Sequence, residues 1–367
     1  MHYPQKSTRD SSRPVIRFLS CDRYTLLQSH FKNLSQNTDC FSFCTVLDVT
    51  GENWNFSEFN ASNKIVQFNH LRVIESIWQE LKPHAKEWWD LLDLSEKEAF
   101  ELPTLPGIDD LTRLIFIANH IESHMLGNQA GDLIVILPPG IKGIKLFEMM
   151  QQGPIIIENL LEPLLNWWDH TKQTLAAIET LMRLKLPSSK KLRFNEHWRL
   201  KFERTQDITS NRDRHQLVAI LDCEGHNLTT ISNKVSLYGM HSSIPSHLIM
   251  CGSKFEAIQC FCSKISSQWM QVMCWQTEQE DASTSKSLET HTGTETSRID
   301  HQNMIRSYFM PCIDKKEMRI QQVDHLIFIF YHGYQRSINI SDFKSGAICK
   351  NAQIDNNWLT LNFELSQ

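Results

Sequence analysis

The chain has 367 residues, of which 41% are hydrophobic and 22% charged, and its formal net charge is −5. This length allows more than one domain at roughly 100–200 residues each, and the composition is typical of a globular protein. The negative balance argues against a general nucleic-acid binder, which needs a basic surface to displace counterions, and no apolar run approaches the roughly 20 residues of a membrane span.

The start of the chain, MHYPQKSTRDSSRP, is basic and rich in serine but lacks the apolar core of a secretory signal. We therefore expect a cytoplasmic protein, with an organelle stroma as the alternative because a transit peptide has a similar composition. None of the ten cysteines belongs to a C-x-x-C pair. We expect these thiols to be reduced and mostly buried.

Apolar runs and helical spacing alternate along the first three quarters of the chain. The apolar runs predict strands over residues 15–20, 41–49, 133–137, 216–221 and 247–251. The helical spacing predicts helices over residues 25–34, 69–92, 111–124, 228–238 and 253–269, and a long helical stretch over about 145–186. Asp109 or Asp110 would cap the helix over 111–124, and Gly239 would end the helix over 228–238. This alternation indicates an α/β fold, a parallel sheet flanked by helices on both faces.

The composition divides the chain into three parts. Residues 1–275 are expected to form the α/β domain, with a helical subdomain over about 145–205 inserted in it. Residues 276–300 are rich in Thr, Ser and Glu and read as a flexible linker. Residues 301–367 read as a small antiparallel β unit, because Trp358 to Leu365 alternates apolar and polar side chains.

One predicted strand ends in an unusual turn. Residues 132–140 read DLIVILPPG, an apolar run that ends in Pro138, Pro139 and Gly140 before a helix. In phosphate-loop ATPases such a strand carries an Asp linked to Mg²⁺, and an earlier Gly-rich loop with a Lys holds the phosphates. Here the strand ends without an acid, and residues 1–50 contain no glycine.

Several weak motifs in a fixed order resemble the ArsA family of ATPases, which includes the guided-entry targeting factors for tail-anchored membrane proteins. ELPTLPGIDD, PPGIKGIKLFEM, QLVAILDCEGHNLTTISNKVSLYG and HLIMCG are similar to successive segments of that family. YQRSINI and KNAQIDNNWLTLNFEL resemble the α-crystallin-like extension of some bacterial members. The resemblance implies a P-loop NTPase-like fold, an ATP site and a helical groove for apolar client segments.

Three departures from the family pattern decide the expected function. The turn after the first strand reads SCDRYTLLQS, with neither Gly nor Lys, although a phosphate cradle in practice needs glycine conformations. Val135 stands near the place of the Mg²⁺-linked Asp, and Cys251 stands where the family has an adenine-reading Asn. We expect a non-hydrolysing pseudo-ATPase that has no catalytic residues, needs no cofactor and retains Pro138 to Gly140 as a degenerate switch-like turn.

The alternative is a nucleotide-binding ArsA-type ATPase whose site is atypical or is completed by a partner subunit. ATP enters this alternative through the resemblance alone, since no residue of the chain supports it. For partners, we expect a protein or an apolar client segment, and a homodimer or a heterodimer with an intact paralogue.

The helical subdomain contains a stretch rich in Met, Leu and Trp, which by the resemblance is a surface for apolar clients. Flexible Met side chains suit a surface that accepts varied partners. Apolar residues at helical spacing are also typical of an ordinary core, so both interpretations stay open. The candidate client surface comprises Phe147, Met149, Met150, Leu160, Leu164, Trp167 and Trp168.

Two further clusters resemble reactive sites at first sight. His120, Glu122 and His124 lie in HIESH, where two His four residues apart could share a helical face. No third ligand is evident, so we expect solvated or capping residues and no metal site. Cys260 and Cys262 would point to different sides of a helix, with Cys262 in its apolar stripe, which favours a core role.

Overall fold

The structure is a computed structural model of the chain. It describes residues 15–23, 25–26, 44–52, 64–81, 108–127, 131–155, 170, 196–253, 255–265, 270–275, 296–343 and 346–365.

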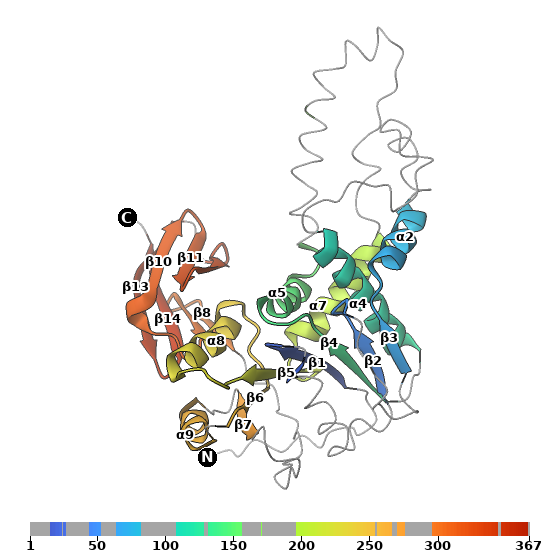
Figure 1. Cartoon of the computed structure of the whole chain (residues 1–367). Helices are drawn as coiled ribbons and strands as arrows, with labels where there is room; N and C mark the ends of the chain where they lie inside the picture. Colours follow the sequence, from blue (N-terminus) through green and yellow to red (C-terminus); the bar gives the residue numbers. More distant parts are fainter. Residues whose placement is uncertain are drawn as a thin grey trace, which may run out of the picture.

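A seven-stranded sheet forms the centre of the larger part of the molecule (Figure 1). Its strand order is β3-β2-β4-β1-β5-β6-β7, and every neighbouring pair is parallel. The strands are β1 (Ile16–Cys21), β2 (Cys44–Asp48), β3 (Lys64–Gln67), β4 (Asp132–Ile136), β5 (His215–Asp222), β6 (His247–Cys251) and β7 (Gln271–Trp275). The predicted α/β fold with a parallel sheet is therefore confirmed.

The central strands are mainly apolar because both faces of the sheet are covered. Every residue of β1, β5 and β6 is buried. Successive side chains alternate between two cores, as the pleat requires. In β6, for example, Leu248 and Met250 belong to the core under the helices, whereas Ile249 and Cys251 belong to a second core that also contains Leu26.

The helices of this part contribute one continuous core with the sheet. Leu114 and Ile117 come from α4, Phe147 from α5, Phe202 from α7 and Val235 from α8. The helix bounds are α2 (His70–Leu81), α4 (Ile108–Leu126), α5 (Ile141–Gln152), α7 (Glu196–Ser210), α8 (Leu228–Met240) and α9 (Phe255–Ile265). Within the described ranges, every helix is too short or too polar to cross a bilayer.

Several predicted elements differ from the observed ones. Strands β3 and β7 were not predicted, because each is short and lies at an edge of the sheet. Helix α4 begins at Ile108, so Asp109 and Asp110 lie in its first turn. Their negative charges interact favourably with the positive end of the helix dipole. Helix α8 continues through Gly239, and His241 occupies the C-cap position.

The C-terminal part consists of two antiparallel sheets with a core of their own. The sheet orders are β10-β11-β12 and β13-β14-β9-β8. Their strands are β8 (Ser297–Asp300), β9 (Ile305–Phe309), β10 (Met318–Val323), β11 (Leu326–Tyr331), β12 (Tyr334–Asn339), β13 (Ala347–Asp355) and β14 (Trp358–Leu365). The predicted β unit thus exists, but it begins inside the segment expected to be a linker, since residues 297–300 pair with β9. Residues 276–295 lie outside the described ranges.

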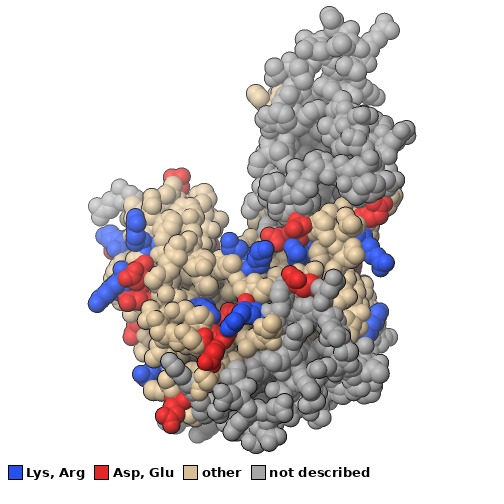
Figure 2. Space-filling model, viewed as in Figure 1, with Lys and Arg blue, Asp and Glu red and all other residues tan. Residues whose placement is uncertain are grey.

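The C-terminal sheets pack against helix α8 (Figure 1). Arg336 of β12 donates from Nη1 to the Gly239 carbonyl at 2.7 Å. A Cβ on Gly239 would lie only 3.0 Å from the Cα of Met310, so the absence of a side chain lets the two parts approach each other. Close packing, rather than a helix end, therefore explains Gly239. The face seen in Figure 2 carries both signs of charge interspersed.

Candidate site at the carboxyl edge of the parallel sheet

The carboxyl ends of β1, β4, β5 and β6 meet at one edge of the sheet. In open α/β sheets this edge is where ligands bind, because the loops that leave parallel strands converge there. The described segments at this edge are residues 22–23 after β1, 137–140 after β4, 223–227 after β5 and 252–253 after β6.

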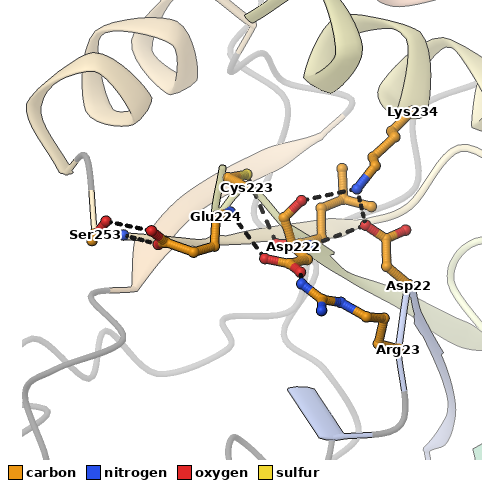
Figure 3. A network of polar contacts seen from close by, with 8 residues as sticks. Asp22, Arg23, Asp222, Cys223, Glu224, Lys234 and Ser253 are labelled. Atoms are coloured by element: carbon orange, nitrogen blue, oxygen red, sulfur yellow. Dashed lines mark hydrogen bonds and ion pairs between the residues drawn. The ribbon is translucent and has the colours of Figure 1, made fainter. Parts of the chain in front are cut away.

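The turn after β1 is held by an acidic side chain (Figure 3). The Asp22 carboxylate accepts a hydrogen bond from the backbone N–H of Asp222 at 3.0 Å and another from Nζ of Lys234 at 2.8 Å. The backbone N–H of Asp22 donates to the Ile220 carbonyl at 3.2 Å. Asp22 therefore joins the end of β1 to the end of β5 and to helix α8.

The same network continues across the edge of the sheet. Lys234 donates a second hydrogen bond to the Asp222 carbonyl at 2.9 Å, and the Asp222 carboxylate forms an ion pair with Arg23. Asp222 also accepts from the N–H of Glu224 at 2.9 Å. The Glu224 carboxylate in turn accepts from the N–H and the hydroxyl of Ser253, both at 2.7 Å (Figure 3).

Burial dominates the titration of groups in this region. It raises the pKa of Asp22 above its usual value, although the hydrogen bond and positive charge of Lys234 oppose that shift. Burial also raises the pKa values of the Cys21 and Cys223 thiols to about 12, and that of Cys251 well above its usual value. These thiols are protonated at neutral pH, so none is a nucleophile.

The predicted switch-like turn is tied to the same strand end. Gly140 has a φ of 62°, a conformation that favours glycine, and it caps helix α5. Its N–H donates to the Cys21 carbonyl at 2.7 Å. A Cβ on Gly143 would lie 2.1 Å from the Pro138 carbonyl oxygen, so only glycine allows the helix to approach the turn so closely. Pro138 is buried, and Pro139 is half-buried.

The two other positions at which the sequence departs from the family pattern are Val135 and Cys251. Val135 is fully buried inside β4 and contributes to the core under the helices. Cys251 is the last residue of β6, and its carbonyl accepts from the N–H of Cys223 at 2.7 Å. Both positions serve packing and the sheet, and neither side chain offers a ligand to Mg²⁺ or to a base.

The described edge does not fit a nucleoside triphosphate. A phosphate cradle needs backbone N–H groups that point into one cavity. Here the N–H groups of Asp22 and Gly140 already donate to carbonyls, and the Asp22 carboxylate would repel a phosphate. The Lys234 ammonium is directed to Asp22 and the Asp222 carbonyl. Residue 24 and residues 27–43 lie outside the described ranges.

The candidate client surface is described only in part. Phe147 and Met150 are 1% and 0% exposed. Phe147 packs edge-on against Phe18 of β1, with the ring centroids 5.0 Å apart, so these two side chains belong to the core in this structure. Met149 is half-buried against the same core. The remaining members, Leu160, Leu164, Trp167 and Trp168, lie outside the described residues, and for them the client surface stays a prediction.

The other two clusters have ordinary structural roles. Glu122 forms ion pairs with Arg204 and Lys201 of α7. Of the expected solvated or capping role, the solvated form is wrong for His124, which is buried in the last turn of α4. Cys260 is exposed and Cys262 is buried, as its place in the apolar stripe predicts. Within the described ranges, His, Cys, Asp and Glu form no group of three that could hold a metal ion.

Sequence reasoning missed the network at the sheet edge. The acidic segment DCEG after an apolar strand is a visible signal, because charged residues that follow a buried strand mark its exposed end. Lys234 gives no such signal, since it resembles any exposed lysine on a helix. Asp22 and Asp222 are 200 residues apart, so only the fold shows that they meet.

Comparisons with known proteins give a distant match at most. No family model matches the chain, and no curated protein matches its sequence. Among solved structures, the Zn(II)-bound YjiA GTPase from E. coli is 11% identical, with a TM-score of 0.30 over 96% of this chain and 95% of that chain. A Zn(II)-bound triple mutant of YjiA is 10% identical, with a TM-score of 0.29 over 96% and 94%. Similarity at this level carries no argument about family or activity.

Proposed function

We propose that this chain is a non-hydrolysing, ArsA-like pseudo-ATPase that acts as a protein- or hydrophobic-client-binding module. The observation that carries the first half of this proposal is the position of Asp22. In phosphate-loop proteins, the turn after the first strand offers N–H groups and a lysine to the phosphates. In this chain that turn offers a carboxylate, and Lys234 neutralises it from helix α8.

Phosphoryl transfer is catalysed almost entirely by positioning and by neutralisation of developing negative charge. The Asp22 carboxylate adds negative charge where neutralisation is required, and the N–H of Gly140 is used to attach the turn after β4 to β1. The sheet edge keeps the parallel strand arrangement, but its own groups occupy the positions that would neutralise and orient a phosphate.

A thermal-shift titration tests this proposal. The full chain is heated with ATP, ADP or GTP and Mg²⁺, each at millimolar concentration. A ligand at 100 times its Kd stabilises the native state by about 2.7 kcal/mol, which is several degrees in Tm. We expect shifts near zero for all three nucleotides. A saturable rise in Tm that disappears in Arg23→Ala would refute the proposal and favour the alternative, a nucleotide-binding ATPase with an atypical site.

A second form of the alternative requires a partner subunit that completes the site. Co-purification of the full chain from its native source, with ATP turnover measured on the complex, tests this form. Turnover by the complex that is absent from either subunit alone would support a completed site. A complex without turnover supports the pseudo-ATPase.

Client binding is tested at residues of the candidate surface that lie outside the described ranges. A fluorescent apolar helical peptide is titrated into the protein and into Leu164→Ser combined with Trp168→Ser. Val323→Ser is the control, because Val323 is a large apolar residue that is 46% exposed on the C-terminal unit. We expect weaker binding only in the double variant. Unchanged binding in a folded double variant would remove the client surface from the proposal.

A further inference from the structure

A cavity of about 320 Å³ lies where the C-terminal sheets meet the loop that follows helix α8. Strands β9 and β12 line it together with Thr296 and Ser297 at the start of β8. Ser242 and Ile244 of the loop after α8 complete the wall. The cavity is thus formed by both parts of the molecule, and it is separate from the sheet edge described above.

Arg336 is the most deeply buried cation of this cavity, with 9% of its surface exposed. Its Nη1 donates to the Gly239 carbonyl at 2.7 Å, and its guanidinium carbon lies 4.4 Å from the centre of the Tyr308 ring. Within the part of the chain that the structure describes, Arg336 forms no ion pair with a carboxylate within 4.0 Å. A neutral carbonyl and an aromatic face stabilise a buried cation only in part.

Arg306 brings a second guanidinium to the same ring. Its carbon lies 5.5 Å from the Tyr308 centroid. Its Nη1 donates to the Asn339 carbonyl at 2.6 Å and lies 3.2 Å from the Asp342 carboxylate. Its Nε is buried and has no hydrogen-bond partner among the described residues.

The charges around this cavity do not balance. Two guanidinium groups line it, whereas no Asp or Glu does, and Asp342 pairs with Arg306 from outside the lining. Glu148 acts electrostatically on Arg336, but its carboxylate is paired with His241 at 2.8 Å. Burial, with a smaller contribution from the neighbouring Arg306, lowers the pKa of Arg336. An anion in the cavity would stabilise the buried charge of Arg336 and offset its repulsion from Arg306.

We propose that this cavity binds a small molecule through a phosphate or carboxylate group, held by Arg306 and Arg336. The planar fork of a guanidinium matches the geometry of both oxyanions. Ser242, Ser297 and Ser337 also line the cavity and could supply further hydrogen-bond donors. Because Arg336 also contacts Gly239, the bound anion would link the C-terminal sheets to helix α8 and stabilise that junction.

Isothermal titration of the full chain with inorganic phosphate and, separately, with citrate tests the proposal at constant ionic strength. We expect saturable binding of at least one of the two, and the one that binds identifies the oxyanion. Arg306→Gln should weaken binding by about tenfold or more, since a charge-assisted hydrogen bond contributes roughly 1.5–3 kcal/mol. Arg319→Gln is the matched control, because Arg319 is an exposed arginine of the same unit outside the cavity.

A second pair of variants keeps the test independent of a folding defect in Arg306→Gln. Ser337 is exposed at the cavity wall, so Ser337→Glu adds a negative charge without disturbing the core. We expect this variant to weaken binding and Ser337→Ala to retain it. Absence of binding to both probes, or equal binding by Ser337→Glu and the parent chain, would overturn the proposal. The nucleotide titration of the sheet edge involves no residue that lines this cavity, so the outcome of each test is independent of the other.

Discussion

Substitution of Lys234 by Met should destabilise the protein because it removes the cation that holds the turn after β1. Lys234 donates to the Asp22 carboxylate and to the Asp222 carbonyl, and its side chain and that of Asp22 are 23% and 17% exposed. A hydrogen bond to a charged group contributes roughly 1.5–3 kcal/mol and a neutral one about 0.5–1.5 kcal/mol. Met retains most of the apolar stem, so we expect a loss of roughly 2–4 kcal/mol.

A double-variant cycle separates this interaction from general damage. Asp22→Asn removes the charge of Asp22 but leaves an oxygen that accepts from the N–H of Asp222. If the Lys234–Asp22 pair carries the effect, Lys234→Met in the Asp22→Asn background should cost about 1 kcal/mol less than it does in the parent chain. Both single variants and the double variant are compared by urea denaturation at one pH.

The pH dependence of the Lys234→Met variant supplies a second readout. Burial already raises the pKa of Asp22, and loss of the Lys234 charge raises it further. A raised pKa in the folded state means that protonated Asp22 favours folding, and that this contribution is lost as pH rises through the folded pKa. The difference in the free energy of unfolding between the Lys234→Met variant and the parent chain should therefore become smaller as pH falls. If Lys234→Met lowers the free energy of unfolding by less than about 0.5 kcal/mol at neutral pH, Lys234 does not hold the turn after β1. Strict additivity of the two substitutions in the cycle would refute the same reasoning.

Three further predictions concern other parts of the fold. Burial lowers the pKa of His215 to about 4, so His215 is neutral in the folded state. The free energy of unfolding should have its full value above about pH 6.5 and fall by up to roughly 3 kcal/mol toward pH 4. Acid titration of the His215→Asn variant should lack this loss. Gly143→Ala places a Cβ 2.1 Å from the Pro138 carbonyl oxygen, and urea denaturation should show a loss of roughly 2–4 kcal/mol. Gly239→Ala crowds Met310 at 3.0 Å, and limited proteolysis should release the C-terminal unit sooner than in the parent chain.

The sequence predicts the central strands well and the edge strands poorly, for a physical reason. Strands β1, β5 and β6 are buried on both faces, so they appear as continuous apolar runs that periodicity can find. Strand β3, with the sequence KIVQ, lies at the sheet edge with half of its residues exposed, and four residues give too short a pattern.

The candidate site is predictable in outline and not in detail. The absence of glycine and lysine from the turn after β1 is visible in the sequence, and the carboxyl edge of a parallel sheet is the expected location of any site. The polar network at that edge depends on Asp22, Asp222 and Lys234, which come from three different parts of the chain. Pairings between residues 200 positions apart are set by strand order, and strand order is a property of the whole sheet.

The network also gives the turn after β4 a structural role. Gly140 donates to the Cys21 carbonyl, and the next residue along the chain, Asp22, is the acceptor for Lys234. The turn after β4 therefore holds the end of β1 in the position from which Asp22 reaches helix α8. The backbone hydrogen bond from Gly140 joins the turn after β4 to the end of β1, and the Asp22–Lys234 ion pair joins the turn after β1 to helix α8. The turn Pro138 to Gly140 therefore has a structural role that depends on no nucleotide.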